Sequence, residues 1–280
     1  MSRIAHITKM ARERGRKLLI PYLVAGDPSL QVTVDLMHSL VESGADVIEL
    51  GIPFSDPSSD GPVIQRSIER ALGNGTSLRD AFNVVAEFRK SDQATPIVLM
   101  GYLNPVEILG ADVFVKKSLE VGVDGVLLVD MPPAEAETIH KKLTEAEIDT
   151  IFLVAPTTSE NRVKSIVELT SGYVYYVSLK GVTGASISDT HSVQRNVDAL
   201  RKMTDLPVVV GFGVKDEQSA KNMSGVSDGV IVGTALVKNI ESLNHSTKVN
   251  YQDIARCTLI IKNIRKYLDS EFNDARKEPE

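Results

Sequence analysis

Three carboxylates fall within twelve positions of the chain, at Glu49, Asp56 and Asp60. Glu49 lies between Ile48 and Leu50 in a short apolar run, so we expect its side chain to be partly desolvated. Desolvation raises the pKa of a carboxyl group toward neutral pH, where it can both donate and accept a proton. The pattern therefore predicts an acid/base residue at Glu49. A structural salt bridge is the alternative, although no Lys or Arg in another apolar run is an obvious partner.

The two aspartates of this stretch have different sequence surroundings. Asp60 precedes Gly61 and Pro62, and an aspartate just before an early proline is typical of a helix start. The residue pattern alone leaves Asp60 open between a helix cap and a second functional carboxylate. Asp56 lies between Ser55 and Pro57, which favours a turn at the tip of an exposed loop.

A second group of residues is rich in glycine and lies in the C-terminal half of the chain. Glycines occur at 181–184, at 211–213 and at Gly233, which Thr234 follows. Glycines let backbone N–H groups approach an anion closely, and a helix beginning near Ala235 would point its positive end at that anion. These segments predict a phosphate site.

The elements that must position these residues are eight short, β-rich apolar runs. They cover Leu18–Val24 and residues 47–50, 97–100, 126–129, 151–154, 173–178, 208–210 and 230–232. The runs are apolar on both faces, and the segments between them have helical spacing, which predicts parallel strands joined by helices. Eight such units without a linker predict an α/β fold, a single (β/α)8 TIM barrel over residues 1–280. Both residue groups then follow the C-terminal ends of strands, where barrel active sites lie.

The two ends of the chain are predicted to lie outside the eight repeats. Residues 1–16 alternate apolar and basic positions, which indicates an extra N-terminal helix across the bottom of the barrel. A last helix over residues 251–270 places Cys257 on its apolar face, so we expect a buried thiol rather than a reactive one. Residues 272–280 are charged and include Pro279, which predicts a frayed tail.

Composition excludes several classes of function. The net charge is −6 with no basic block, which argues against nucleic acid or an anionic membrane as a partner. No apolar run approaches the roughly 20 residues that span a bilayer, and a single cysteine fits a reducing compartment. We expect a cytoplasmic protein. None of the five histidines begins a zinc motif, and there is no nucleotide-binding Gly-Lys pair, so no metal is expected.

The chain resembles the tryptophan synthase alpha subunit family along essentially its whole length. The most specific match is residues 49–57 together with 60–62, and further matches are 26–28, Tyr102 with Asn104-Pro105, 181–184 and 211–213. The resemblance implies retro-aldol cleavage of indole-3-glycerol phosphate to indole and glyceraldehyde 3-phosphate, with no cofactor in this chain. It implies that Glu49 transfers protons at indole C3 and at the glycerol hydroxyl. Asp60 would accept the indole N–H, and Tyr175 would help to position Asp60.

The same resemblance implies where the substrate is held. The indole slot would be formed by Tyr22, Met100, Leu127, Val129, Leu153 and Phe212. The phosphate would be held by Gly184, Gly213, Gly233 and Thr234, and Thr183 would lie on a loop that closes over the substrate.

The resemblance also implies a partner, a beta subunit that carries pyridoxal phosphate, in an alpha2beta2 heterotetramer. Its docking face would include Pro53, Asp56 and Asn104. Ser59 departs from the small apolar residue common before Asp60 in the family, which bears on this coupling more than on the cleavage reaction.

Three other functions remain open from the sequence. Lys180, near the end of the sixth apolar run, could form a Schiff base in an aldolase of another type. The chain could release indole without a partner. It could also be a non-catalytic barrel that acts as an allosteric subunit, against which the presence of both Glu49 and Asp60 counts.

Overall fold

The computed structural model describes residues 2–177, 190–211, 213–245 and 248–275, and the side chains of 271–275 are not described. The strands, in chain order, are β1 (Leu18–Val24), β2 (Ile48–Gly51), β3 (Ile97–Gly101), β4 (Gly125–Leu128), β5 (Asp149–Thr150), β6 (Leu153–Val154), β7 (Val174–Val177), β8 (Val208–Gly211) and β9 (Gly229–Val232). All of their pairings are parallel, in the order β5-β4-β3-β2-β1-β9-β8-β7-β6. Each predicted run thus contributes one strand. The fifth run, 151–154, contributes β6, and the short strand β5 lies just before it, outside the predicted range.

The split fifth strand closes the barrel. Only Ile151 and Phe152 separate β5 from β6, the two ends of the sheet order. The Ile151 N–H donates to the Val126 carbonyl on the β4 side, and the Phe152 carbonyl accepts from the Tyr175 N–H on the β7 side. The linking residues therefore continue both ladders, and the predicted (β/α)8 barrel is confirmed.

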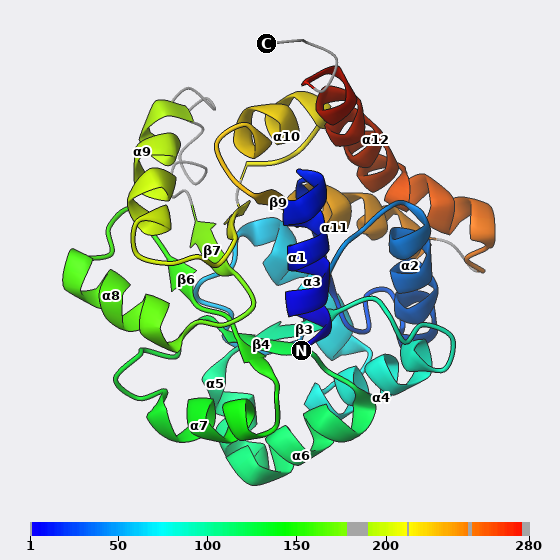
Figure 1. Cartoon of the computed structure of the whole chain (residues 1–280). Helices are drawn as coiled ribbons and strands as arrows, with labels where there is room; N and C mark the ends of the chain where they lie inside the picture. Colours follow the sequence, from blue (N-terminus) through cyan, green and yellow to red (C-terminus); the bar gives the residue numbers. More distant parts are fainter. Residues whose placement is uncertain (1, 178–189, 212, 246–247, 276–280) are drawn as a thin grey trace.

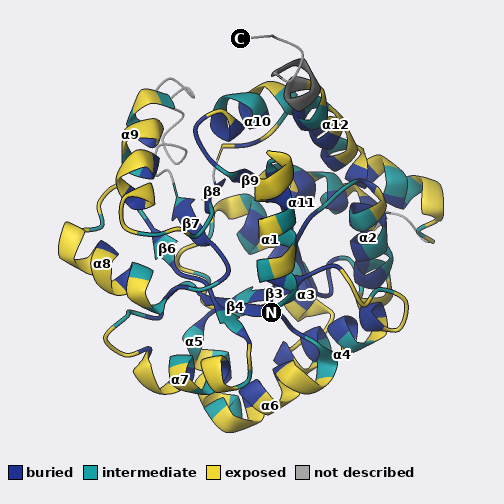
Figure 2. Cartoon of the chain, viewed as in Figure 1, coloured by how far each residue is buried: buried dark blue, intermediate teal, exposed yellow. Residues whose placement is uncertain are grey.

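Helices surround the barrel on the outside (Figure 1). They are α2 (Leu30–Glu42), α3 (Pro62–Gly73), α4 (Leu78–Arg89), α5 (Leu103–Leu109), α6 (Ala111–Val121), α7 (Glu137–Glu145), α8 (Glu160–Leu169), α9 (Thr190–Arg201), α10 (Glu217–Ser224), α11 (Thr234–Glu241), the short 3-10 helix η2 (Ser242–His245) and α12 (Tyr251–Ala275). Figure 2 shows their exposed residues on the outer side and their buried residues toward the strands. The main apolar core lies between this ring of helices and the outer face of the strands.

A smaller core fills the inside of the barrel. It is built from alternate positions of the strands, because residues two apart on a strand share a face; examples are Leu18 and Ile20 on β1, and Tyr173 and Tyr175 at β7. The predicted N-terminal helix is present as α1 (Arg3–Arg14), which lies across the ring in Figure 1. Its Ile4 and Ala11 are buried in the interior core. The helix therefore plugs the N-terminal end of the barrel and leaves the C-terminal end for function.

Three aspartates join neighbouring strands at the N-terminal end. Each aspartate lies just before a strand and accepts a backbone N–H from the start of the strand before it, at 2.8 Å. The pairs are Asp46 with Leu19, Asp124 with Ile97, and Asp228 with Val208. Each also pairs with an arginine: Arg265, Arg89 and Arg201. These carboxylates have structural partners, so this end of the barrel is stabilised by contacts that take no part in the site described below.

The C-terminal helix is longer than predicted. α12 continues to Ala275, so residues 272–275 belong to the helix and not to the tail, which corrects that part of the prediction. No glycine or proline occurs between Tyr251 and Ala275, and the first helix-breaking residue is Pro279. Residues 276–280 lie outside the described part of the chain. Cys257 is buried on this helix, as predicted, and burial raises the pKa of its thiol.

Candidate active site

Glu49 is a fully buried carboxyl group inside the barrel. It lies on β2, paired with Tyr22 of β1 and Val98 of β3, and its side chain shares the inner face with that of Val47, two residues earlier. Its Oε1 accepts a hydrogen bond from the Tyr173 hydroxyl at 2.7 Å, whereas its Oε2 has no partner among the described residues. No described Lys or Arg forms an ion pair with Glu49, so the salt-bridge alternative does not hold in this part of the chain.

Burial controls the protonation of Glu49. Desolvation raises its pKa to about 8, and the hydrogen bond from Tyr173 opposes that rise only in part. The group is therefore mostly protonated at neutral pH, yet it can ionise within the working range of an enzyme. One oxygen is held by Tyr173, and the other is free to exchange a proton with a bound molecule.

Asp60 is half-buried and does not cap a helix. The N-cap of α3 is Gly61, which makes no side-chain capping bond, and Pro62 occupies the first turn. The Asp60 Oδ2 instead accepts a hydrogen bond from the Tyr102 hydroxyl at 2.6 Å. Burial raises the pKa of Asp60, and the Tyr102 bond opposes this rise. Of the two alternatives that the sequence left open, the structure favours a carboxylate with a dedicated partner.

Tyr102 is held on both sides of its hydroxyl. It follows β3 directly, and α5 begins at the next residue, where the Asp130 carboxylate accepts the Leu103 N–H at 2.7 Å. The Tyr102 oxygen accepts the Ser59 N–H at 3.1 Å while its proton is donated to Asp60. A phenol that accepts from one neighbour has its own proton directed at the other, so Tyr102 orients Asp60.

Two more tyrosines line the space around the carboxylates. Tyr22 and Tyr175 are buried, and their pKa values are raised first by burial and then by the negative charges of Asp60 and Glu49. Each ring occupies space that a neighbouring glycine leaves: a Cβ on Gly51 would lie 2.3 Å from the Tyr22 hydroxyl oxygen, and one on Gly211 would lie 2.3 Å from that of Tyr175. The charges of both carboxylates therefore act on Tyr175. The hydroxyl bonded to Asp60 is that of Tyr102, and the positioning role of Tyr175 stays a prediction.

The residues expected to form an apolar slot lie together. Leu127 belongs to the interior core, and Met100, Val129 and Leu153 pack against it from β3, from the end of β4 and from β6. Tyr22 packs in an adjoining cluster that also contacts Met100. Tyr22 is also the strand partner of Glu49, so these residues lie beside that carboxyl group, and their role as an indole slot stays a prediction. Phe212 lies outside the described residues.

The predicted phosphate residues are partly described. Gly233 directly follows β9 and is the N-cap of α11, whose first residue is Thr234, so the first N–H groups of this helix face the C-terminal end of the barrel. Gly213, after β8, has φ +81° and open space where a Cβ would be. That space leaves the backbone accessible to a ligand. Thr183 and Gly184 lie outside the described residues, as does Lys180.

The predicted docking residues differ in exposure. Asp56 is exposed at the loop tip, where its carboxylate accepts the Ser55 hydroxyl at 2.6 Å, and Asn104 is exposed on α5. Pro53 is buried. Four residues beyond Asn104, Ile108 has 81% of its surface exposed, which is unusual for an aliphatic side chain.

Two site residues, Tyr173 and Tyr102, received no role from the sequence. Tyr173 could have been found from its spacing, because it lies two residues before Tyr175 and must share its face. Tyr102 could have been found from its place directly after a strand.

No group of three or more potential metal ligands occurs among the described residues, and no described helix is long and apolar enough to cross a membrane.

Replacing Tyr102 with Phe is expected to lower kcat/KM by about tenfold, because a hydrogen bond to a charged group contributes roughly 1.5–3 kcal/mol. The pKa of Asp60 should rise further, so activity should be lost at a higher pH on the acid side. The measurement is a pH profile of kcat/KM. Tyr176→Phe is the matched control, since that hydroxyl accepts from Asn196 at 2.7 Å away from the site. An unchanged profile for Tyr102→Phe would exclude the orienting role.

Comparison with known proteins places these features in one family. The model of the family "Tryptophan synthase alpha chain" matches residues 8–267. The chain is 50% identical over 273 residues to a tryptophan synthase alpha chain from Nitrosococcus oceani, covering 98% of this chain and 100% of that protein. The crystal structure of tryptophan synthase subunit alpha from Legionella pneumophila superposes with a TM-score of 0.89 at 40% identity, covering 96% of this chain and 99% of that one. An aminoacrylate-bound tryptophan synthase from M. tuberculosis gives a TM-score of 0.83 at 32% identity, over 96% of this chain and 100% of that one.

Proposed function

This chain belongs to the tryptophan synthase alpha chain family, and from that premise we propose that it cleaves indole-3-glycerol phosphate to indole and glyceraldehyde 3-phosphate. The reaction is a carbon–carbon bond cleavage of the retro-aldol type. The observation that carries the proposal is the Glu49 carboxyl, which is buried, has one oxygen held by Tyr173 and has the other without a partner among the described residues.

Glu49 supplies the proton transfers. At neutral pH its protonated form, favoured by burial, gives a proton to C3 of the indole ring and leaves a carboxylate. The carboxylate then accepts the proton of the glycerol hydroxyl next to C3. The bond between C3 and the carbinol carbon breaks, its electron pair returns to the indole ring, and the carbinol becomes the aldehyde. Glu49 ends as it began, so no external acid or base is consumed.

Asp60 stabilises the charge that forms between these transfers. Protonation at C3 places positive charge on the indole nitrogen, and an ionised carboxylate that accepts the N–H stabilises that charge in a site with little water. Asp60 must therefore be ionised while Glu49 is protonated. The hydrogen bond from Tyr102 opposes the effect of burial on Asp60 and supports this difference.

Binding groups at the ends of the strands hold the two halves of the substrate. The indole ring occupies the slot of Tyr22, Met100, Leu127, Val129 and Leu153, with Phe212 as a further wall. The phosphate is held by backbone N–H groups at Gly213, Gly233 and Thr234 at the start of α11. Gly184, which the family resemblance adds to this group, lies outside the described residues. The family resemblance assigns Thr183 a role in closing over the substrate, and this residue too lies outside the described part of the chain.

A beta subunit is the partner, in an alpha2beta2 heterotetramer located in the cytoplasm. Pyridoxal phosphate belongs to that partner, and the reaction of this chain needs neither a cofactor nor a metal. Exposed Asp56 and Asn104 flank the Pro53 loop and form the docking face, with Pro53 supporting the loop from within.

Indole release from indole-3-glycerol phosphate by the purified chain tests the function. We expect slow release by the chain alone and faster release after a beta subunit is added. Equal rates with and without the partner would indicate a lyase that works alone. No release under either condition would leave a ligand-binding barrel and overturn the proposal. Borohydride with substrate should leave no covalent adduct, because an adduct would indicate a Schiff base at a lysine such as Lys180.

A further inference from the structure

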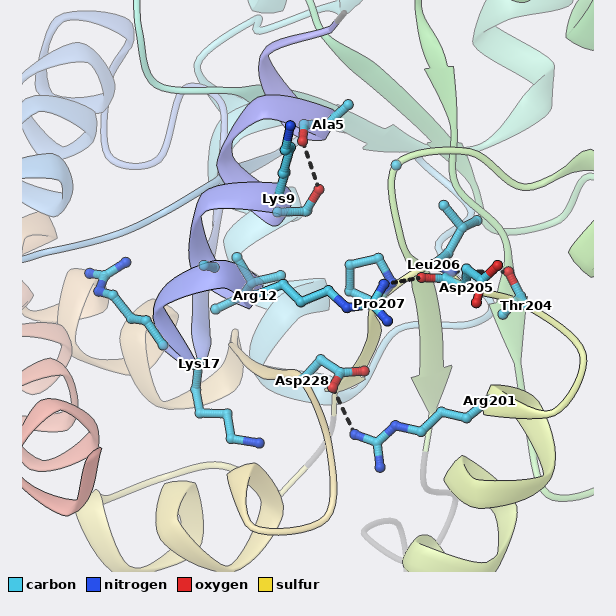
Figure 3. A pocket seen from close by; sticks show the side chains of 16 residues that line it. Ala5, Lys9, Arg12, Lys17, Arg201, Thr204, Asp205, Leu206, Pro207 and Asp228 are labelled. Atoms are coloured by element: carbon cyan, nitrogen blue, oxygen red, sulfur yellow. Dashed lines mark hydrogen bonds and ion pairs between the residues drawn. The ribbon is translucent and has the colours of Figure 1, made fainter. Parts of the chain in front are cut away.

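A cavity lies at the N-terminal end of the strands, away from the carboxylates of the site. It has a volume of about 490 Å³, within the range of sites for small ligands. Its walls are α1, residues 15–18, residues 204–207 and the pair Arg201 and Asp228 (Figure 3). We name it the basal cavity.

The basal cavity carries an excess of positive charge in an acidic chain. Its charged lining consists of five cations, Lys9, Arg12, Arg16, Lys17 and Arg201, and two carboxylates, Asp205 and Asp228. Three of these cations have carboxylate partners. Arg16 pairs with Asp46 and Asp269, Lys9 pairs with Glu13, and Arg201 pairs with Asp198 and Asp228. The lining cations still outnumber the lining carboxylates, although the whole chain has a net charge of −6.

Lys17 forms no ion pair with a described carboxylate, although the carboxylate of Asp228 lies nearby. Both oxygens of Asp228 are occupied: Oδ1 pairs with Arg201 at 2.7 Å, and Oδ2 accepts the Val208 N–H at 2.8 Å. The half-buried Lys17 ammonium donates to the Ser227 carbonyl at 2.6 Å, and no described carboxylate lies within ion-pair distance of it. Burial lowers the pKa of Lys17, the negative charge of Asp228 opposes this, and the charge of Arg201 lowers the pKa further. A further anion here would offset the two lowering effects.

Arg12 presents a second cation to the cavity. In Figure 3 it extends from α1 toward Pro207, and Lys17 and Arg201 lie below it on either side of Asp228. Its one hydrogen bond is long, 3.4 Å to the Asp205 carbonyl, and among the described residues it has no carboxylate partner. An arginine in the last turn of a helix stabilises the helix dipole, which accounts for Arg12 but not for Lys17, which lies beyond the helix.

We propose that the basal cavity binds a small organic anion, with its carboxylate or phosphate group between Lys17 and Arg12 and its apolar body against Leu206 and Pro207. The lining has both parts of such a site, cations without carboxylate partners and apolar side chains between them. A bound anion would join α1 to the segment that leads into β8. Because α1 plugs the barrel, this ligand would stabilise the fold without entering the catalytic end.

Binding of 2-naphthoate to the full chain tests the proposal, with uncharged 2-naphthamide as its neutral counterpart. We expect the carboxylate to bind at least about tenfold more tightly than the amide, and to shift the backbone amide signals of Gly15 and Gly172, which line the cavity. Lys17→Gln should weaken 2-naphthoate binding by about tenfold, and exposed Arg12→Gln, which carries little risk to folding, by about threefold or more. Lys116→Gln, on the exposed face of α6, should leave binding unchanged.

Three results would overturn the proposal. The first is equal affinity for 2-naphthoate and 2-naphthamide, or no binding of either at millimolar concentration. The second is unchanged affinity in both Lys17→Gln and Arg12→Gln. The third is a shift confined to Gly233 and its neighbours, which would place the probe at the phosphate site of the proposed function. All three results concern binding of the probe and none depends on whether the chain releases indole. The proposed function and the basal-cavity proposal can therefore fail separately.

Discussion

Glu49→Gln is expected to lower kcat for indole release by about 10³-fold, within the range that general acid–base groups contribute. Glutamine has nearly the same shape and still offers an oxygen to the Tyr173 hydroxyl, so the barrel interior should be preserved. What is lost is the proton that must reach indole C3. KM should change little because the substituted group transfers protons and does not hold the substrate. Steady-state assays of indole formation give both constants.

The control for this substitution is Glu42→Gln. Glu42 also accepts a hydrogen bond from a tyrosine hydroxyl, that of Tyr251 at 3.2 Å, but on the exposed surface. The activity of the Glu42→Gln variant should equal that of the unsubstituted chain. If Glu49→Gln retained more than a tenth of the original kcat, Glu49 would not be the acid/base group.

The pH dependence of the unsubstituted chain follows from the pKa of Glu49, about 8. Burial disfavours the charged form, so the acid that protonates C3 is present below this pH, and kcat/KM should fall as the pH rises through about 8. Tyr173→Phe removes a hydrogen bond that lowers this pKa, and should therefore move the alkaline limb to higher pH. If the alkaline limb of the pH profile does not move in Tyr173→Phe, that limb reports the ionisation of a group other than Glu49.

Asp60→Asn is expected to lower kcat by about 10²-fold, the lower end of the loss seen when one group that stabilises developing charge is removed. The amide oxygen can still accept the indole N–H and the Tyr102 hydroxyl, so substrate binding should be largely retained. The negative charge is absent, and the positive charge on the indole nitrogen is then less stabilised. The acid limb of the pH profile that reports ionisation of Asp60 should also disappear.

Asp112→Asn is the matched control for Asp60→Asn. Asp112 is an exposed aspartate on α6 that pairs with Lys142, far from the carboxylates of the site. Its loss should leave kcat and the acid limb unchanged. A normal kcat in the Asp60→Asn variant would show that the charge of Asp60 is not needed for the reaction and that its role is structural.

The strands of this fold could be predicted because their sequence signal is local. A run apolar on both faces, such as 208–210, has few other stable places than the inside of a covered parallel sheet. The break within 151–154 could not be predicted, because it depends on which backbone groups of β4 and β7 lie opposite Ile151 and Phe152. The length of α12 was underestimated because a polar C-terminal turn resembles a tail in composition.

The candidate site was predictable in its carboxylates but not in their partners. Glu49 could be recognised because a charge inside an apolar run is rare. Asp60 could not be separated from a helix cap, because the decision depends on Tyr102, which lies 42 positions later in the chain. Similarly, the hydroxyl of Tyr173 reaches Glu49 across 124 positions. The first contact needs β2 and β3 to pair, and the second needs the two halves of the barrel to meet.

The closure of the barrel also has a consequence for how the chain folds. Every strand pair but one joins neighbours in the sequence, and the exception is β1 with β9, which aligns Leu18 with Gly229. The entropy lost in closing a loop grows with its length, so this pairing is the step with the largest loop-closure cost. Two arcs of local contacts, β1–β5 and β6–β9, can therefore form before the chain ends meet. The catalytic end takes residues from both arcs, so it is complete only once this non-local pairing has formed.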